Sequence, residues 1–169
     1  MGKILGSWSG MRKYLEQEML ADSLNVHVRY NCTRYIGMDG SHIFELYVNG
    51  KVFKRFSLEI VNSYFIDQGY CEKGCGLTDY WENFWSLLDK HPINTRTEYT
   101  DGEFCNALEA YRNQEISLSL RSENPIVRMF AILDRRVGKR TLMKLKETVT
   151  QQPNWLQALY SLRISTEGI

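Results

Sequence analysis

The hydrophobic pattern changes its period between the first and second parts of the chain. Over residues 9–23 large apolar side chains recur every three or four positions, which predicts an amphipathic helix. Over residues 26–33 apolar and polar residues alternate, as they do in a half-buried strand. The runs at 43–48 and 52–56 predict two more strands.

Turn signals connect the three predicted strands. Asn49 and Gly50 directly separate the last two, and both residues tolerate the positive φ of a type I′ turn. A glycine-containing stretch at residues 37–41 is a second turn, between the first strand and the second. We therefore expect a three-stranded antiparallel meander.

The pattern is helical from residue 57 to the end of the chain. Ser57 can cap the first of these helices, and Thr100 with Glu103 forms a capping box for a later one. Asn124 followed by Pro125 opens another. The sequence thus predicts an α+β fold with an N-terminal helix, the meander and a helical C-terminal half packed on the sheet. Helical residues should outnumber strand residues more than twofold.

Length and composition indicate an ordinary globular domain. The chain has 169 residues, 43% of them hydrophobic and 24% charged, which excludes a disordered chain, a collagen-like fibre and a disulfide scaffold. We expect one domain over residues 1–169, with residues 1–68 holding helix, meander and helix, and residues 78–169 forming a helical lobe.

The same inspection indicates where the protein resides. The chain starts without the apolar stretch of a signal peptide, and its longest apolar run, residues 129–133, is far too short to span a membrane. We expect a cytoplasmic protein with no membrane contact and four reduced cysteines. Cys71 and Cys75 have a spacing that zinc sites allow, but no second pair follows at motif spacing. We therefore expect no metal and no other cofactor.

Charge is distributed unevenly along the chain. The net charge is +1, yet residues 1–56 carry +3, residues 57–127 carry −7 and residues 128–169 carry +5. Two interpretations are open. The acidic and basic parts neutralise each other within the fold, or the basic part offers a surface to an anionic partner.

The densest basic segment lies at an expected helix junction. Residues 128–146 hold seven Lys or Arg residues and one Asp. If one helix ends near Gly138 and the next begins near Thr141, four cations gather there. They are Arg135, Arg136, Lys139 and Arg140. Free N–H groups at a helix start beside them would bind an anion. Alternatively, Arg135 and Arg136 stabilise a helix C-terminus while Lys144 and Lys146 only solvate an outer face.

The chain shows no catalytic motif, and we assign no catalytic residue. Nucleophile elbow, zincin and dinucleotide-binding patterns are all missing from it. Our first hypothesis is a non-enzymatic binding or accessory protein whose basic junction meets nucleic acid or an acidic protein surface. One alternative is an enzyme with a cleft between sheet and helical lobe. Another is a structural subunit that forms homo-oligomers through exposed aromatic residues, with Tyr80, Trp81, Phe84 and Trp85 as candidates.

Three segments of the chain are similar to segments of a known protein family. Residues 11–20, residues 29–33 and the stretch from Asn124 to Leu142 resemble a family of small bacterial proteins with no established function. The resemblance covers nearly the whole chain. It implies a single domain in a bacterial cytoplasm, and it implies no activity and no site residues.

Overall fold

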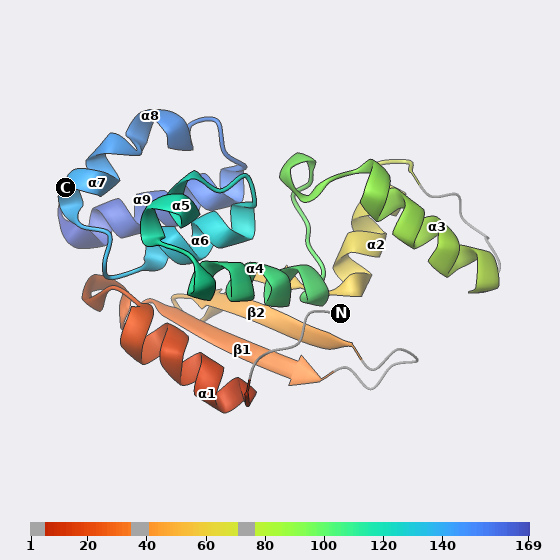
Figure 1. The fold of residues 1–169 in the computed structure, drawn as a ribbon, viewed down its shortest axis with the longest axis horizontal. Helices are drawn as coiled ribbons and strands as arrows, with labels where there is room; N and C mark the ends of the chain where they lie inside the picture. The colour runs from red at the N-terminus through yellow and green to blue at the C-terminus, as the bar shows by residue number, and fades with distance from the viewer. Residues whose placement is uncertain (1–5, 35–40, 71–76) are drawn as a thin grey trace.

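A computed structural model describes residues 6–34, 41–70 and 77–169 and has the expected α+β architecture (Figure 1). Helix α1 (Trp8–Lys13) continues as the π-helix η1 (Tyr14–Met19), and a short 3₁₀ turn η2 (Asp22–Leu24) leads into the sheet. The strands are β1 (Val28–Arg34), β2 (His42–Val48) and β3 (Lys51–Phe56).

The helices after the sheet occupy the rest of the described chain. They are α2 (Leu58–Asp67), α3 (Leu77–Lys90), the 3₁₀ turn η3 (Ile93–Thr95), α4 (Asp101–Asn113), α5 (Ile116–Arg121), α6 (Pro125–Leu133), α7 (Lys139–Lys144), α8 (Lys146–Val149) and α9 (Asn154–Glu167). Among the described residues 61% are helical and 15% lie in strands, so the expected excess of helix is confirmed.

The sheet is the antiparallel meander that the pattern predicts. Its order is β1-β2-β3, with Phe44 of β2 paired to Cys32 on one side and to Phe56 on the other. Asn49 has a φ of 51° and Gly50 a φ of 77°, which is the backbone of the expected tight hairpin turn. The Asn-Gly prediction is therefore confirmed.

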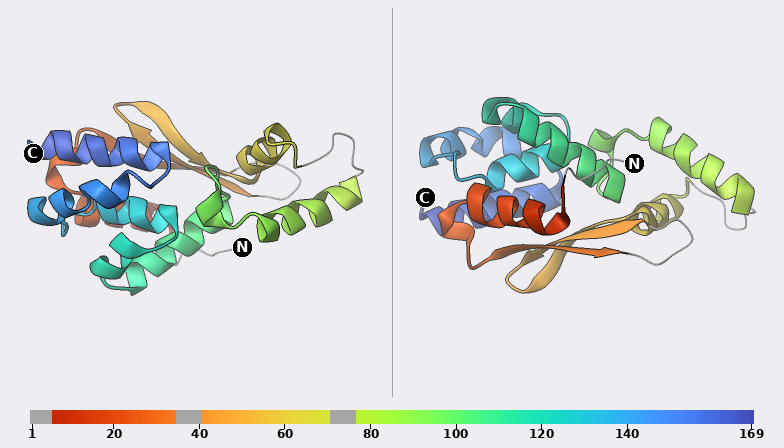
Figure 2. Two further views of the ribbon diagram at one scale, coloured as in Figure 1. Left: turned by 90° about the horizontal axis from the view of Figure 1, so that it is seen from above. Right: turned by 60° about the horizontal axis from the view of Figure 1, so that its bottom comes forward.

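Helices cover one face of this sheet, as the right-hand view of Figure 2 shows. On that inner face Phe44 and Phe56 are almost completely buried. On the outer face a polar row crosses the strands through Asn31, Glu45 and Arg55. Arg55 Nη2 lies 2.9 Å from Glu45 Oε2, and Asn31 Nδ2 lies 3.3 Å from Glu45 Oε1. The alternation of buried and polar positions explains why the strands show a period of two.

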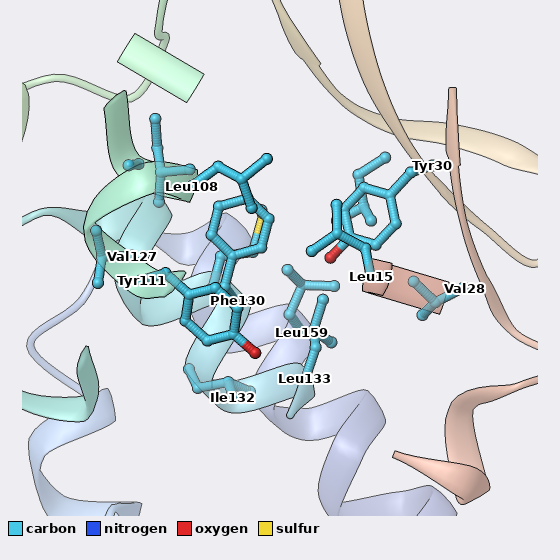
Figure 3. Packing of buried hydrophobic residues seen from close by; sticks show 14 of the residues in the cluster. Leu15, Val28, Tyr30, Leu108, Tyr111, Val127, Phe130, Ile132, Leu133 and Leu159 are labelled. Carbon is cyan, nitrogen blue, oxygen red and sulfur yellow. The ribbon is translucent and has the colours of Figure 1, made fainter. Parts of the chain in front are cut away.

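The main core is built around Phe130 of α6. Its ring centroid lies 5.2 Å from that of Tyr111, 5.5 Å from that of Phe104 and 6.2 Å from that of Tyr30. Figure 3 shows Phe130 beside Tyr111, with Leu133 and Leu159 below. The rings come from α4, α6 and β1, so this packing fixes the helical half on the sheet.

A second, smaller hydrophobic cluster lies between α2 and α3. It consists of Leu58, Val61, Phe65 and Phe84, all buried. We call these two helices the α2–α3 arm, because they extend away from the remaining helices in both Figures 1 and 2. The assignment of the chain to one domain stays a prediction.

Two helix ends predicted from the pattern are wrong. The first helical segment ends at Met19 and not near Ser23, because Leu20 is extended and forms a β-bridge with Asp134. That bridge also ends α6 at Leu133, well before Gly138. Residues 134–138 therefore form an irregular turn between α6 and α7. A short helix that the pattern did not resolve, α5, separates α4 from α6.

Candidate anion-binding surface

Arg163 of α9 holds the turn between α6 and α7 in place. Its Nη1 donates to the carbonyl oxygens of Ile132 and Asp134, each at 3.0 Å, and its Nη2 donates to that of Val137 at 2.8 Å. Its Nε lies 3.0 Å from Glu167 Oε1. Arg163 is only 2% exposed, and this burial lowers the pKa of its guanidinium, partly offset by Glu167. One side chain thus satisfies carbonyls that the end of α6 leaves without helical partners.

A buried carboxylate organises the same turn from inside. Asp134 is 1% exposed, and its Oδ1 accepts the backbone N–H of Arg136 at 2.7 Å. The Arg136 guanidinium pairs with Asp134, with Nη2 to Oδ2 at 2.6 Å, and the Tyr111 hydroxyl donates to Oδ2 as well. Burial and this bond to Asp134 raise the pKa of Tyr111. The hydrogen bond with Asp134 raises the pKa of Arg136. Arg136 therefore serves as the counterion of a buried acid.

Arg135 connects the turn to the N-terminal segment. Its Nη2 lies 2.6 Å from Asp22 Oδ1, its Nε donates to the Leu20 carbonyl at 3.3 Å, and its backbone N–H donates to the Met19 carbonyl at 2.7 Å. The predicted cluster of four cations is therefore divided. Arg135 and Arg136 are held in ion pairs, although both remain more than 40% exposed at the side chain.

The other two predicted cations, Lys139 and Arg140, lie exposed in the first turn of α7. Lys144 and Lys146 are exposed as well, and within the described residues none of the four forms an ion pair. We call these four side chains the α7–α8 basic surface. From the pattern, Lys144 and Lys146 were expected only to solvate an outer helix face. Arg140 and Lys144 are four residues apart, one helical turn, and this spacing was the sequence signal that could have placed both on the same surface.

Local helix physics disfavours this arrangement of charges. The first turn of α7 holds two cations and no acid, and its N-cap Gly138 offers no side-chain hydrogen bond. A cation near a helix N-terminus costs about 0.3–1 kcal/mol, and like charges one turn apart cost about 0.2–0.5 kcal/mol. Residues that break local rules without a compensating contact are typical of functional surfaces.

Reversing one of these charges should therefore stabilise the protein. We expect Arg140→Glu to raise the free energy of unfolding by about 0.5–1 kcal/mol, because it places an acid in the first turn, four residues before Lys144. Urea unfolding followed by circular dichroism measures the change. The matched control is Lys90→Glu, in the last turn of α3, where a cation is favourable and its reversal should destabilise. A loss of stability in Arg140→Glu would contradict this account.

Within the described residues, the basic residues 128–169 form no ion pair with the acidic residues 57–127. The pairs of residues 128–169 are Arg135–Asp22, Arg136–Asp134 and Arg163–Glu167. None of these acids belongs to residues 57–127. Among the described residues, direct neutralisation of the acidic part is therefore limited to one ion pair with residues 1–56, between Lys54 and Glu98, and includes none with residues 128–169.

Lys54 of β3 is a buried amine outside this surface. It is 6% exposed and donates to the Thr97 carbonyl, and its Nζ lies 3.0 Å from Glu98 Oε2. The same Nζ lies 5.2 Å from the ring centroids of both Tyr99 and Trp155. Burial lowers the pKa of Lys54, partly offset by Glu98. These contacts attach the sheet to α9, so we interpret Lys54 as a structural residue.

The other residues singled out from the sequence are the two cysteines with zinc-site spacing and the aromatic residues of α3. Cys71 and Cys75 lie outside the described residues, as do the side chains of Tyr80 and Trp81. Phe84 is buried at 2% exposure, whereas Trp85 is 52% exposed. In the described chain we find neither a cluster of three or more metal-ligating side chains nor a helix long and apolar enough to cross a bilayer.

The two free cysteines of the described chain are protected thiols. Burial, with a smaller contribution from the charge of Asp101, raises the pKa of Cys32 to about 11 and that of Cys105 to about 12. A thiol that stays protonated at neutral pH is a poor nucleophile.

A meander covered on one face by helices, with exposed cations on α7 and α8 that form no ion pair with other described residues, defines a small α+β protein. Residues 7–164 match the model of the SF0329 protein family, so the chain belongs to that family. This match confirms the resemblance to a small family without an established function. Comparison with curated proteins and with solved structures gave no match. A bacterial origin and a cytoplasmic location stay predictions.

Proposed function

We propose that this protein is a non-enzymatic nucleic-acid-binding protein that contacts phosphates through the α7–α8 basic surface. The observation that carries the proposal is the exposure of four cations within residues 139–146, none of them in an ion pair with another described residue. Cations that the fold does not use remain available to an anionic partner.

The composition of the surface favours nucleic acid over an acidic protein. Three of its four cations are lysines, a residue type depleted in protein–protein interfaces. Lysine, in contrast, is a common phosphate-binding residue, which acts as a point charge. Met143, 63% exposed, is the one large apolar side chain that α7 exposes. A surface with so little apolar area contributes affinity mainly through charge, which is typical of contacts to a phosphate backbone.

Binding should therefore be weak and strongly dependent on salt. Four phosphate contacts predict that log K falls with log salt at a slope of about −3.6 for duplex DNA. Replacing Lys139, Arg140, Lys144 and Lys146 together by glutamine should abolish that slope, because glutamine keeps the helical propensity but removes the charge. Fluorescence anisotropy with labelled duplex DNA and RNA, titrated between roughly 50 and 200 mM salt, measures it.

The matched control is Arg135→Gln, which removes a nearby exposed cation that already pairs with Asp22. We expect its slope to equal that of the unaltered protein. Failure to bind either nucleic acid at roughly 50 mM salt, where the electrostatic contribution is strong, would overturn the proposal. Binding to polyglutamate with no binding to DNA or RNA would instead identify the partner as an acidic protein surface.

A further inference from the structure

A cleft with a volume of about 390 Å³ lies between the α2–α3 arm and the start of α4. Its size is in the range of small-molecule sites. Trp85, Leu88 and Asp89 of α3 form one wall, and the first turns of α4 form the other. Figure 1 shows these two helices on either side of the chain that carries η3. Neither wall includes a residue of the α7–α8 basic surface.

The charged lining of the cleft leaves a net negative charge. Arg96 and Glu103 pair with each other, with Nη1 to Oε1 at 3.0 Å, and Arg96 is only 2% exposed. The other two charged residues of the lining are Asp89, which is exposed, and Asp101, which is 5% exposed. Within the described residues neither acid forms an ion pair, and Asp101 Oδ2 accepts only the backbone N–H of His42, at 3.1 Å. An anionic ligand would be repelled, and a cation would be attracted.

The uncharged lining of the cleft is apolar and aromatic. Leu58, Leu88 and Ile93 provide aliphatic surface, and Trp85 presents an indole ring that is 52% exposed. An indole face attracts organic cations more strongly than other aromatic side chains do. A bare metal ion gains nothing from aliphatic surface, whereas an alkyl chain gains from being removed from water. The lining therefore matches a ligand that is both cationic and aliphatic.

We propose that this cleft binds an aliphatic ammonium ion. The hydrocarbon part lies on Leu58, Leu88 and Ile93, and the ammonium group lies between the ring of Trp85 and the carboxylate of Asp89. A free alkylamine and the side chain of a lysine residue share this chemistry.

The test uses the whole protein with ¹⁵N-labelled tryptophan, and the variant Trp85→Phe assigns the indole signal of Trp85. Titration with n-pentylammonium should shift that signal to saturation. Pentan-1-ol, which has the same alkyl chain without the charge, should bind at least fivefold more weakly. Nα-acetyl-lysine methylamide, titrated in parallel, reports whether the site also accepts the amine when a peptide carries it.

Asp89→Asn should weaken n-pentylammonium binding about fivefold, which corresponds to an ion pair worth about 1 kcal/mol. The matched control is Asp67→Asn, an exposed acid on the same arm that does not line the cleft, and it should leave the affinity unchanged. Thermal unfolding of both variants checks that each is folded. A Trp85 signal that does not move with n-pentylammonium, or that moves equally with pentan-1-ol, would overturn the proposal.

Discussion

Replacing Arg163 with methionine is expected to lower the free energy of unfolding by about 3–5 kcal/mol, the range for breaking a buried ionic network at one partner. The substitution leaves three carbonyl oxygens, those of Ile132, Asp134 and Val137, without the donor that now serves them. It also leaves Glu167 without its partner at 3.0 Å. Methionine fills a similar volume, so the loss of unfolding free energy reflects the missing hydrogen bonds of Arg163 more than a change in packing.

Urea unfolding followed by circular dichroism measures this loss. Because a loss of that size is a large share of the stability of a typical domain, Arg163→Lys provides a milder second variant. Lysine keeps the charge but cannot reproduce the forked donors, so its effect should be intermediate. The control Arg140→Met removes an exposed arginine whose charge is locally unfavourable, so it should not lower the free energy of unfolding. Equal effects at positions 163 and 140 would refute the role assigned to Arg163.

Replacing Asp134 with alanine is expected to lower the free energy of unfolding by about 3 kcal/mol or more. The Tyr111 hydroxyl and the backbone N–H of Arg136 both lose their acceptor inside a site that is 1% exposed. Asp134→Asn keeps one acceptor oxygen and should lower the free energy of unfolding by less than Asp134→Ala does. Arg136→Gln removes the counterion of this buried acid and should also lower the free energy of unfolding, but by less than Asp134→Ala, because the Arg136 side chain is 45% exposed and water can replace part of its contacts.

A double-mutant cycle of Asp134→Ala with Tyr111→Phe separates the hydrogen bond from the rest of the network. We expect a coupling free energy of about 1–3 kcal/mol, as for a hydrogen bond to a charged group. Additive effects of the two substitutions would show that the hydroxyl and the carboxylate contribute independently, and would contradict the role assigned to their hydrogen bond.

Elements whose signals lie within a few neighbouring residues were predictable from the sequence. Asn49 and Gly50 specify their turn through their own tolerance of positive φ. Thr100 and Glu103 form both hydrogen bonds of the capping box, each at 3.0 Å. Asn124 caps α6 through two backbone N–H groups, as the Asn-Pro signal indicates. These features need no information from distant parts of the chain.

Features that depend on distant residues were not predictable. The helical pattern continues past Leu133, yet α6 ends there because Asp134 pairs with Leu20, more than a hundred residues earlier in the chain. The ion pair of Arg135 with Asp22 is equally remote in sequence. For that reason the sequence did not distinguish Arg135 and Arg136, which form ion pairs that support the turn, from Lys139 and Arg140, which form none with other described residues.

The two walls of the cleft belong to elements that are stabilised by separate hydrophobic clusters. One wall belongs to the α2–α3 arm, whose hydrophobic cluster holds four buried residues among the described side chains, and the other belongs to α4, which is part of the much larger main core. Segments with few buried contacts open at a lower free energy than the global unfolding of the protein. The distance between the walls can therefore fluctuate while the core remains folded, and a ligand that bridges them would slow the amide hydrogen exchange of the arm.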